Sequence, residues 1–242
     1  MLLAIKKEAS EFRITLGFGN TEPIQLKSLL MRLNVITVFK ELSDKFSGMA
    51  IRAGDFRFMI INSNHSIGRQ NFSICHELYH LYVDDNFRPH HCNSGLFDKR
   101  KEQEYNADIF ASYFLMPDDG ITRLISQEEL VAKDKITIET ILRIEQSFGC
   151  SRSALLFRLK ELGIISAEGY DGFKQNVKLL ARQYGYPTEL YEPGNKNLVI
   201  GDYAAVARHL YDAGKISEGH YTALLQSIGL DILNVDDNGA GD

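Results

Sequence analysis

The pentapeptide His76-Glu77-Leu78-Tyr79-His80 constrains this chain more than any other feature. On a helix, residues four positions apart lie one turn apart on the same face, so both imidazoles can reach one metal ion. Zinc accepts a neutral histidine nitrogen at about 2.0–2.1 Å. Glu77 would then lie beside a water ligand and could take its proton. The spacing predicts a helix with a zinc site and a base, although two histidines can also belong to an ordinary polar or buried helix face.

The residues before this motif predict a hairpin followed by a buried helix. Residues 49–52 and 56–61 are rich in apolar and β-branched side chains, and Ala53-Gly54-Asp55 between them is typical of a turn. Residues 69–75 then lead directly into His76. Apolar side chains recur there at helical spacing on more than one side, as expected of a buried helix: Phe72, Ile74, Cys75, Leu78, Tyr79, Leu81 and Tyr82.

A third ligand is needed because two histidines leave zinc under-coordinated. Residues 104–117 carry an apolar stripe at helical spacing, and Glu104 shares the direction of that stripe. Asp108, one turn further on, could accept the free N–H of a zinc histidine and fix its tautomer. Glu102 is a rival ligand, but it points about 160° away from the stripe on a helical wheel. An acidic helix start that only faces solvent is the alternative.

These motifs together resemble the ImmA/IrrE family of metallopeptidases. The resemblance covers roughly residues 20 to 165, and the motifs match in order and spacing. The segments that carry it are Ile61-Asn62, Arg69-Gln70-x-Phe72, Cys75-His76-Glu77-Leu78-Tyr79-His80, Glu104-x-x-Ala107-Asp108-x-Phe110-Ala111 and Leu115-Met116-Pro117.

The resemblance implies roles for several of these residues. His76, His80 and Glu104 would hold zinc, Glu77 would be the general base, and Asp108 would support a histidine. Cys75 and Tyr79 stand where the family usually has alanine and glycine, and neither is a ligand position. Family members cleave a cognate helix-turn-helix repressor, often one encoded alongside in a mobile element or a stress regulon. The resemblance therefore implies relief of transcriptional repression by a zinc endopeptidase.

Composition places the chain among intracellular globular proteins. The 242 residues include only three cysteines, so no disulfide framework is indicated. No secretory signal and no membrane-length apolar run is present, which predicts a cytoplasmic protein without membrane contact. A net charge of −5 argues against unassisted nucleic-acid binding.

The polar segment 84–101 connects the two predicted metal helices and is a candidate substrate-facing loop. It contains His90, His91 and Cys92. Adjacent histidines project in different directions, so a second metal site there is disfavoured. We also expect a substrate strand to add to the outer edge of the hairpin, which makes Met49, Ala50, Ile51 and Tyr79 candidate substrate contacts. The sequence identifies no oxyanion stabiliser.

Residues 136–165 predict two helices across a short turn, with Gly149 closing the first and Ser151 capping the second. This pattern resembles a helix-turn-helix, and the second helix carries Arg152, Arg158 and Lys160. Direct DNA binding is one interpretation, but few of these residues suit base recognition. A scaffold or partner-docking unit is the favoured interpretation.

The prediction for the whole chain is an α+β fold. It comprises a small antiparallel sheet with a helical zinc-peptidase core, a helix-turn-helix-like unit and a helical C-terminal module. The expected boundaries are 1–130 for the peptidase domain, 131–168 for the unit, 169–235 for the module and 236–242 for a disordered tail. A non-catalytic or DNA-binding regulator that uses residues 136–165 is the main alternative, and a toxin-like protease of broad specificity is a third.

Overall fold

A five-stranded sheet supports the helices that carry the sequence motifs described above. The computed structural model describes residues 2–85 and 91–230 of the chain. The strands are β1 (Ile36–Lys40), β2 (Gly48–Ala53), β3 (Phe56–Asn62), β4 (His91–Cys92) and β5 (Val199–Ile200), and they lie in the order β4-β2-β3-β1-β5. The predicted hairpin is confirmed, because β2 and β3 pair antiparallel around Gly54 at a φ of 56°.

The sheet is mixed, which corrects the prediction of an antiparallel one. β1 runs parallel to β3, with Ile36 opposite Phe58, whereas β5 and β4 add antiparallel at the two edges. β1 lies beside β3 and not beside β2, although β2 is the next strand in the sequence. Strand order depends on long-range packing, and local residue patterns do not report it.

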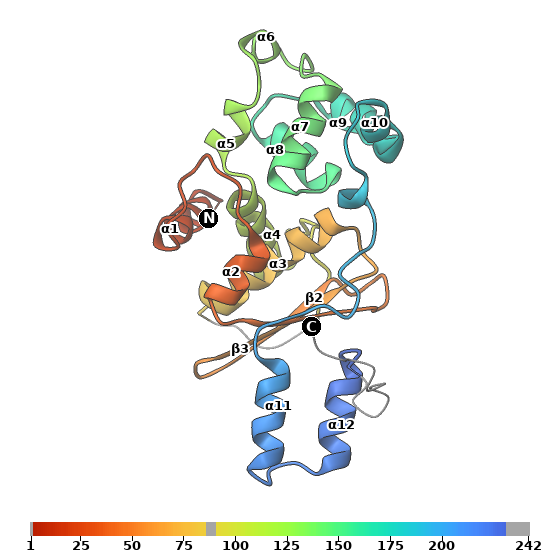
Figure 1. Ribbon diagram of the computed structural model, residues 1–242. Helices are drawn as coiled ribbons and strands as arrows, with labels where there is room; N and C mark the ends of the chain where they lie inside the picture. Colours follow the sequence, from red (N-terminus) through yellow and green to blue (C-terminus); the bar gives the residue numbers. More distant parts are fainter. Residues whose placement is uncertain (1, 86–90, 231–242) are drawn as a thin grey trace.

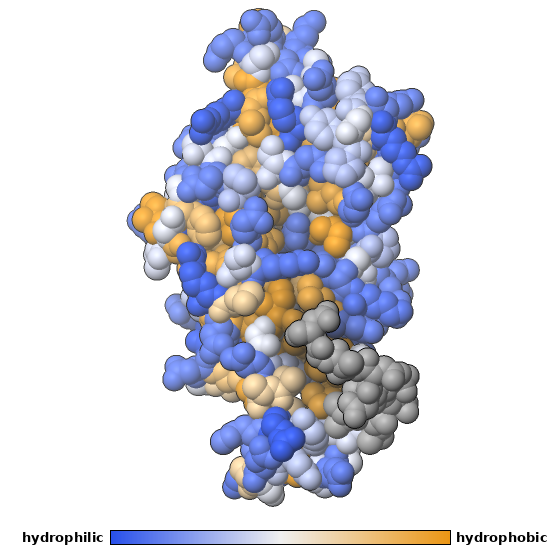
Figure 2. All heavy atoms as spheres, in the orientation of Figure 1, coloured by the Kyte–Doolittle hydropathy of each residue, from blue (hydrophilic) through white to orange (hydrophobic). Residues whose placement is uncertain are grey.

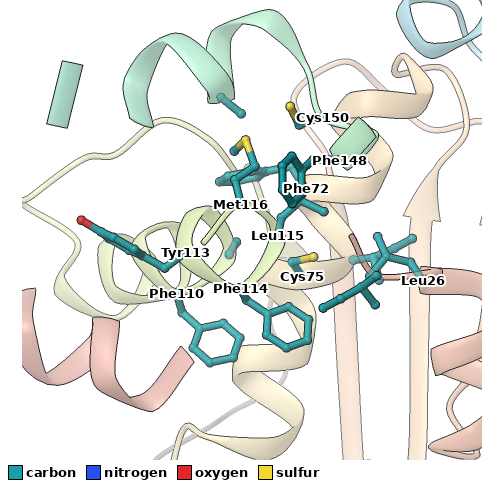
Figure 3. Close-up of a cluster of buried hydrophobic side chains, with 14 of the residues drawn as sticks. Leu26, Phe72, Cys75, Phe110, Tyr113, Phe114, Leu115, Met116, Phe148 and Cys150 are labelled. Atoms are coloured by element: carbon teal, nitrogen blue, oxygen red, sulfur yellow. The ribbon is translucent and has the colours of Figure 1, made fainter. Parts of the chain in front are cut away.

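Four helices cover one side of this sheet. They are α1 (Leu2–Thr15), α2 (Leu26–Arg32), α3 (Ile67–Tyr82) and α4 (Glu102–Leu115). α3 packs on β2 and β3, α4 packs along α3, and α1 packs on α4 (Figure 1). Almost every side chain of α3 from Phe72 to Leu81 is buried, as its two-sided apolar pattern predicts. The aromatic rings of α4 fill the centre of the core together with side chains from α2, α3 and the segment before α5 (Figure 3).

A buried arginine fixes α1 against α4. The Arg13 guanidinium is fully buried and donates to the backbone oxygens of Phe114, Gly19 and Glu22 at 2.6, 2.8 and 2.6 Å. Three charge-assisted hydrogen bonds compensate for the loss of water around the cation. One of these acceptors, Gly19 O, lies in the Gly-rich segment 17–20 that follows α1, so this segment has a structural role.

The predicted helices of residues 136–165 are also confirmed. α7 (Ile138–Phe148) ends at Gly149 in the left-handed conformation with a φ of 60°, and α8 (Arg152–Glu161) is capped by the Ser151 hydroxyl. Two short helices not predicted from the sequence, α5 (Asp118–Arg123) and α6 (Gln127–Leu130), lead into this unit. The turn rests on α3, because Asn71 Nδ2 donates to Gly149 O at 2.8 Å.

The arginines of this unit face inward. Arg152 is 3 % exposed, is ion-paired with Glu145 and donates to Phe173 O at 2.8 Å. Arg158 is fully buried, is ion-paired with Asp118 and lies 3.6 Å from the centre of the Tyr113 ring. Two of the three cations considered for phosphate contacts are therefore used in packing this unit onto the rest of the protein. Only Lys160 is exposed.

The C-terminal residues return to the sheet. α9 (Ala167–Phe173) and α10 (Val177–Gln183) are separated by Asn176, which has a φ of 55°. The 3₁₀ turn η1 (Glu189–Tyr191) precedes β5, and α11 (Tyr203–Asp212) and α12 (Glu218–Ser227) follow it. This last helical pair packs on the other side of the sheet through Val38, Leu225 and Ile228 (Figure 1).

The three domain boundaries and the 236–242 tail remain predictions, and the tail lies outside the described residues. Among the described residues, no helix combines the length and apolar character needed to cross a membrane. On the face drawn in Figure 2, hydrophilic residues dominate the two ends of the molecule and apolar residues reach the surface mainly in the middle.

Candidate metal centre

Three side chains from two helices converge on one buried point. His76 and His80 lie one turn apart on α3, and both are fully buried. Glu104, in the first turn of α4, faces them: its Oε2 lies 3.5 Å from His76 Nε2 and its Oε1 lies 3.3 Å from His80 Nε2. Ligand atoms held tetrahedrally at zinc distances lie about 3.3–3.6 Å apart. The three groups therefore fit around one zinc-sized ion.

Asp108 fixes the orientation of His76. Its Oδ1 lies 2.9 Å from His76 Nδ1, so Nε2 is the nitrogen turned toward Glu104. The Asp108 carboxylate also accepts hydrogen bonds from the backbone N–H groups of Gly95 and Phe97, at 2.7 and 2.8 Å. One carboxylate thus supports a histidine and holds the loop between the two helices. This is the geometry expected of an outer partner of a ligating histidine.

The site has an excess of negative charge that a cation would balance. Burial opposes protonation of His76, but the neighbouring Asp108, Cys92 and Glu104 outweigh burial and raise the pKa of His76 well above its ordinary value. His76 Nε2 is buried and faces Glu104 Oε2 at 3.5 Å, beyond the length of an ordinary hydrogen bond. A metal ion would replace the proton and give that nitrogen a partner, so metal binding should release protons.

His80 has a partner that the sequence analysis missed. Its Nδ1 lies 3.1 Å from Asp84 Oδ2, and the same oxygen accepts a hydrogen bond from Gln103. α3 ends at Tyr82, so Asp84 lies in the turn just beyond the helix. The i, i+4 spacing from His80 to Asp84 was a usable signal, because the same spacing joins Glu104 to Asp108. Each histidine therefore has its own carboxylate.

Glu77 is enclosed by the protein beside the two histidines. It is fully buried, and neither carboxylate oxygen has a hydrogen-bond partner among the described residues. Burial raises the pKa of Glu77, with His76 and His80 opposing the change. A buried carboxylate without a partner is destabilising, and such groups cluster where chemistry needs them.

Gly48 makes room for this carboxylate. A Cβ atom built on Gly48 would lie 2.8 Å from Glu77 Oε1 and 3.2 Å from Ile60 O. We expect Gly48→Ala to displace the Glu77 side chain and to lower peptidase activity by about 10²-fold, because a shift of about 1 Å in a catalytic group can have that effect. Bound metal should be unchanged. The measurements are turnover and metal content, with Gly219→Ala, whose Cβ would enter open space, as the matched control.

Cys92 is a fourth potential ligand at the same point. One ligand atom from each of His76, His80, Cys92 and Glu104 lies within 4.8 Å of all the others. From the sequence alone, Cys92 is a candidate ligand only for a second metal site with His90 and His91. His90 and the side chain of His91 lie outside the described residues. The sequence did offer one signal, namely a thiol in the segment that joins two metal-binding helices.

The remaining predicted site residues lie near this centre in different environments. β4 pairs with Gly48 and Met49, so part of the β2 edge expected to receive a substrate is covered. Ala50 is fully buried and Tyr79 is 7 % exposed and packs on Phe110, whereas Met49 and Ile51 are partly exposed. Glu102 is exposed and lies outside the cluster. A surface pocket reaches the centre and is lined by Lys45, Asn93, Leu96, Asp98, Lys101, Glu104 and Asp108.

Comparison with known proteins agrees with this geometry. The family model of the IrrE N-terminal-like domain, Peptidase_M78, matches residues 34–160, which is more than half of the chain. No curated protein matches the chain. The matched residues include the hairpin, both metal-site helices and the unit formed by α7 and α8. The chain therefore belongs to the ImmA/IrrE family of metallopeptidases.

Proposed function

We propose that this protein is a zinc-dependent endopeptidase that hydrolyses a peptide bond in a cognate helix-turn-helix repressor and so relieves repression. The observation that supports it most directly is the placement of two histidine nitrogens 3.3–3.5 Å from one carboxylate, next to the fully buried glutamate Glu77. A purely structural zinc site has no use for that glutamate.

Each residue has a distinct role in this proposal. His76, His80 and Glu104 hold the ion, and Asp108 and Asp84 keep the two imidazoles in the tautomer that presents Nε2. Zinc, when bound, polarises the scissile carbonyl and lowers the pKa of water toward 7. Glu77 accepts the proton of the attacking water and passes it to the leaving amine. Its dry surroundings strengthen it as a base by raising its pKa.

The substrate backbone would lie along β2. Met49, Ala50 and Ile51 offer strand hydrogen bonds that demand no particular side chain, which suits a flexible segment of a repressor. Tyr79, on α3, packs on Phe110 of α4. The repressor as substrate rests on the family's typical activity, and the zinc on the nitrogen and oxygen donors of the site.

The alternative of a DNA-binding regulator has less support. Arg152 and Arg158 are buried in ion pairs, so they are not available to phosphates. A salt-dependent shift of promoter DNA by the chain alone would favour the alternative.

The test is a cleavage assay with the zinc-loaded full chain and a helix-turn-helix repressor encoded beside its gene. We expect two fragments whose masses sum to the repressor plus one water, and no cleavage after removal of zinc by a chelator. A helix-turn-helix protein from an unrelated operon serves as the specificity control. Cleavage of both proteins would indicate a broad protease, and a zinc-loaded chain that leaves both intact would contradict the proposal.

A further inference from the structure

We propose that Cys92 is a fourth ligand of the metal centre and that β4 holds the site in a closed, resting state. This inference rests on the proposed function, because it assumes that His76, His80 and Glu104 bind the ion. It adds a residue to the site and a mechanism of regulation, since catalysis would require Cys92 to leave.

The position of the thiol supports ligation. Cys92 Sγ lies 3.9 Å from Glu104 Oε1, and its side chain is 1 % exposed. A sulfur at about 2.3 Å and an oxygen at about 2.0–2.2 Å from zinc lie about 3.5–3.7 Å apart in a tetrahedron. A shift of a few tenths of an ångström would bring Cys92 Sγ and Glu104 Oε1 to that separation. His76 Nε2, which is buried, belongs to the same cluster of ligand atoms.

The backbone around Cys92 is fixed by several independent contacts. Cys92 is paired with Gly48 across the β4–β2 ladder, and Ser47 N donates to Cys92 O at 2.8 Å. Arg69 Nη2 donates to Asn93 Oδ1 at 3.2 Å, and the hydroxyls of Ser73 and Ser94 are 2.8 Å apart. The following residues are held by Asp108, which itself supports His76. The thiol is therefore delivered to the centre by an ordered segment that depends on α3 and α4.

A fourth protein ligand would change the character of the site. Catalytic zinc sites have three protein ligands and one position open to water or substrate, whereas sites with four protein ligands are structural. With Cys92 bound, no position remains for the attacking water. Opening breaks the sulfur–metal bond, solvent water takes the vacated position, and the thiolate takes up a proton from solvent. No oxidant is needed.

The same movement would open the substrate edge. β4 pairs with Gly48 and Met49, and Met49 is one of the residues proposed to bind the substrate backbone. A segment that replaces β4 on β2 would therefore remove the thiol as it binds. Substrate binding and activation would thus be coupled by competition for one strand edge.

The test uses cobalt in place of zinc, because a thiolate bound to Co²⁺ gives an intense near-ultraviolet charge-transfer band and His and Glu ligands do not. We expect this band in the wild-type full chain and in Cys75→Ala/Cys150→Ala, which keeps Cys92 as its single cysteine. We expect Cys92→Ala to bind cobalt without the band. The variant should also bind zinc at least about tenfold more weakly, because losing even a group that only supports a metal ligand has an effect of that size.

Acetohydroxamate, which needs a free coordination position, is the second probe. If the closed state holds nine-tenths or more of the molecules, Cys92→Ala should bind acetohydroxamate at least about tenfold more tightly than wild type. The Cys75→Ala/Cys150→Ala variant should behave like wild type in both measurements.

The outcomes separate the two proposals. Cobalt bound in wild type without a thiolate band, or equal hydroxamate affinity with and without Cys92, would overturn the inference and leave the peptidase proposal intact. A wild-type chain that binds neither cobalt nor zinc would contradict the proposed function and the inference with it. If Cys92→Ala does not fold, the band in the single-cysteine variant still decides whether Cys92 is a ligand.

Discussion

Glu77→Gln is expected to lower kcat for repressor cleavage by about 10²–10⁴-fold, the range attributed to a general base, while the bound zinc stays in place. Glutamine has nearly the same shape as glutamate, so it fits the space that Gly48 leaves beside Oε1. Its amide cannot accept the proton of the attacking water. Because Glu77 is not one of the proposed ligands, metal stoichiometry should be unchanged. The measurements are the rate constant of repressor cleavage under single-turnover conditions and the metal content of the same sample.

The matched control for this variant is Glu102→Gln. It makes the same chemical change at an exposed carboxylate in the first turn of α4. It should cleave like wild type. Turnover by Glu77→Gln close to that of wild type would rule out Glu77 as the base and would require another proton acceptor near the centre.

Glu104→Ala is expected to have the second largest effect, this time on the metal itself. Wild type should carry about one zinc per chain, as a three-ligand catalytic site does, and the variant should bind zinc at least about tenfold more weakly. The reason is that the Glu104 oxygens lie within 3.5 Å of both histidine Nε2 atoms. Elemental analysis after dialysis and competition with a chromogenic chelator measure the change.

Glu102→Ala again supplies the comparison, since the sequence left Glu102 as the rival ligand. It should retain zinc like wild type. Undiminished zinc in Glu104→Ala would move the third ligand elsewhere, with Cys92 as the first candidate because it reaches the same point.

The parts of the site that the sequence predicted follow from helical periodicity. His76 and His80 lie on one helix and Glu104 and Asp108 on another, and the i, i+4 spacing within each pair predicts that its two side chains share one face. The hairpin, α7 and α8 followed from turn and capping residues with strong local preferences, such as Gly54, Gly149 and Ser151.

The parts that were missed depend on long-range contacts. β4 and β5 are two residues long and acquire their structure only by pairing with β2 and β1. Cys92 therefore carried no periodic signal that could bring it to His76. Asn176 breaks a helix that its neighbours favour, because it adopts a left-handed backbone conformation. Arg152 and Arg158 resemble exposed cations in the sequence, and only their buried partners show otherwise.

β5 has a practical consequence for expressing the residues matched by the family model without the C-terminal residues that follow them. The family match ends at residue 160, yet β5 pairs with Thr37 and Val38, and Phe39 exchanges backbone hydrogen bonds with Asn197 and Leu198. A chain cut after residue 160 would expose this edge of β1 together with the apolar side chains that α12 covers. Unpaired strand edges recruit other strands. Such a fragment would be expected to aggregate, and its insolubility would say nothing about the catalytic centre.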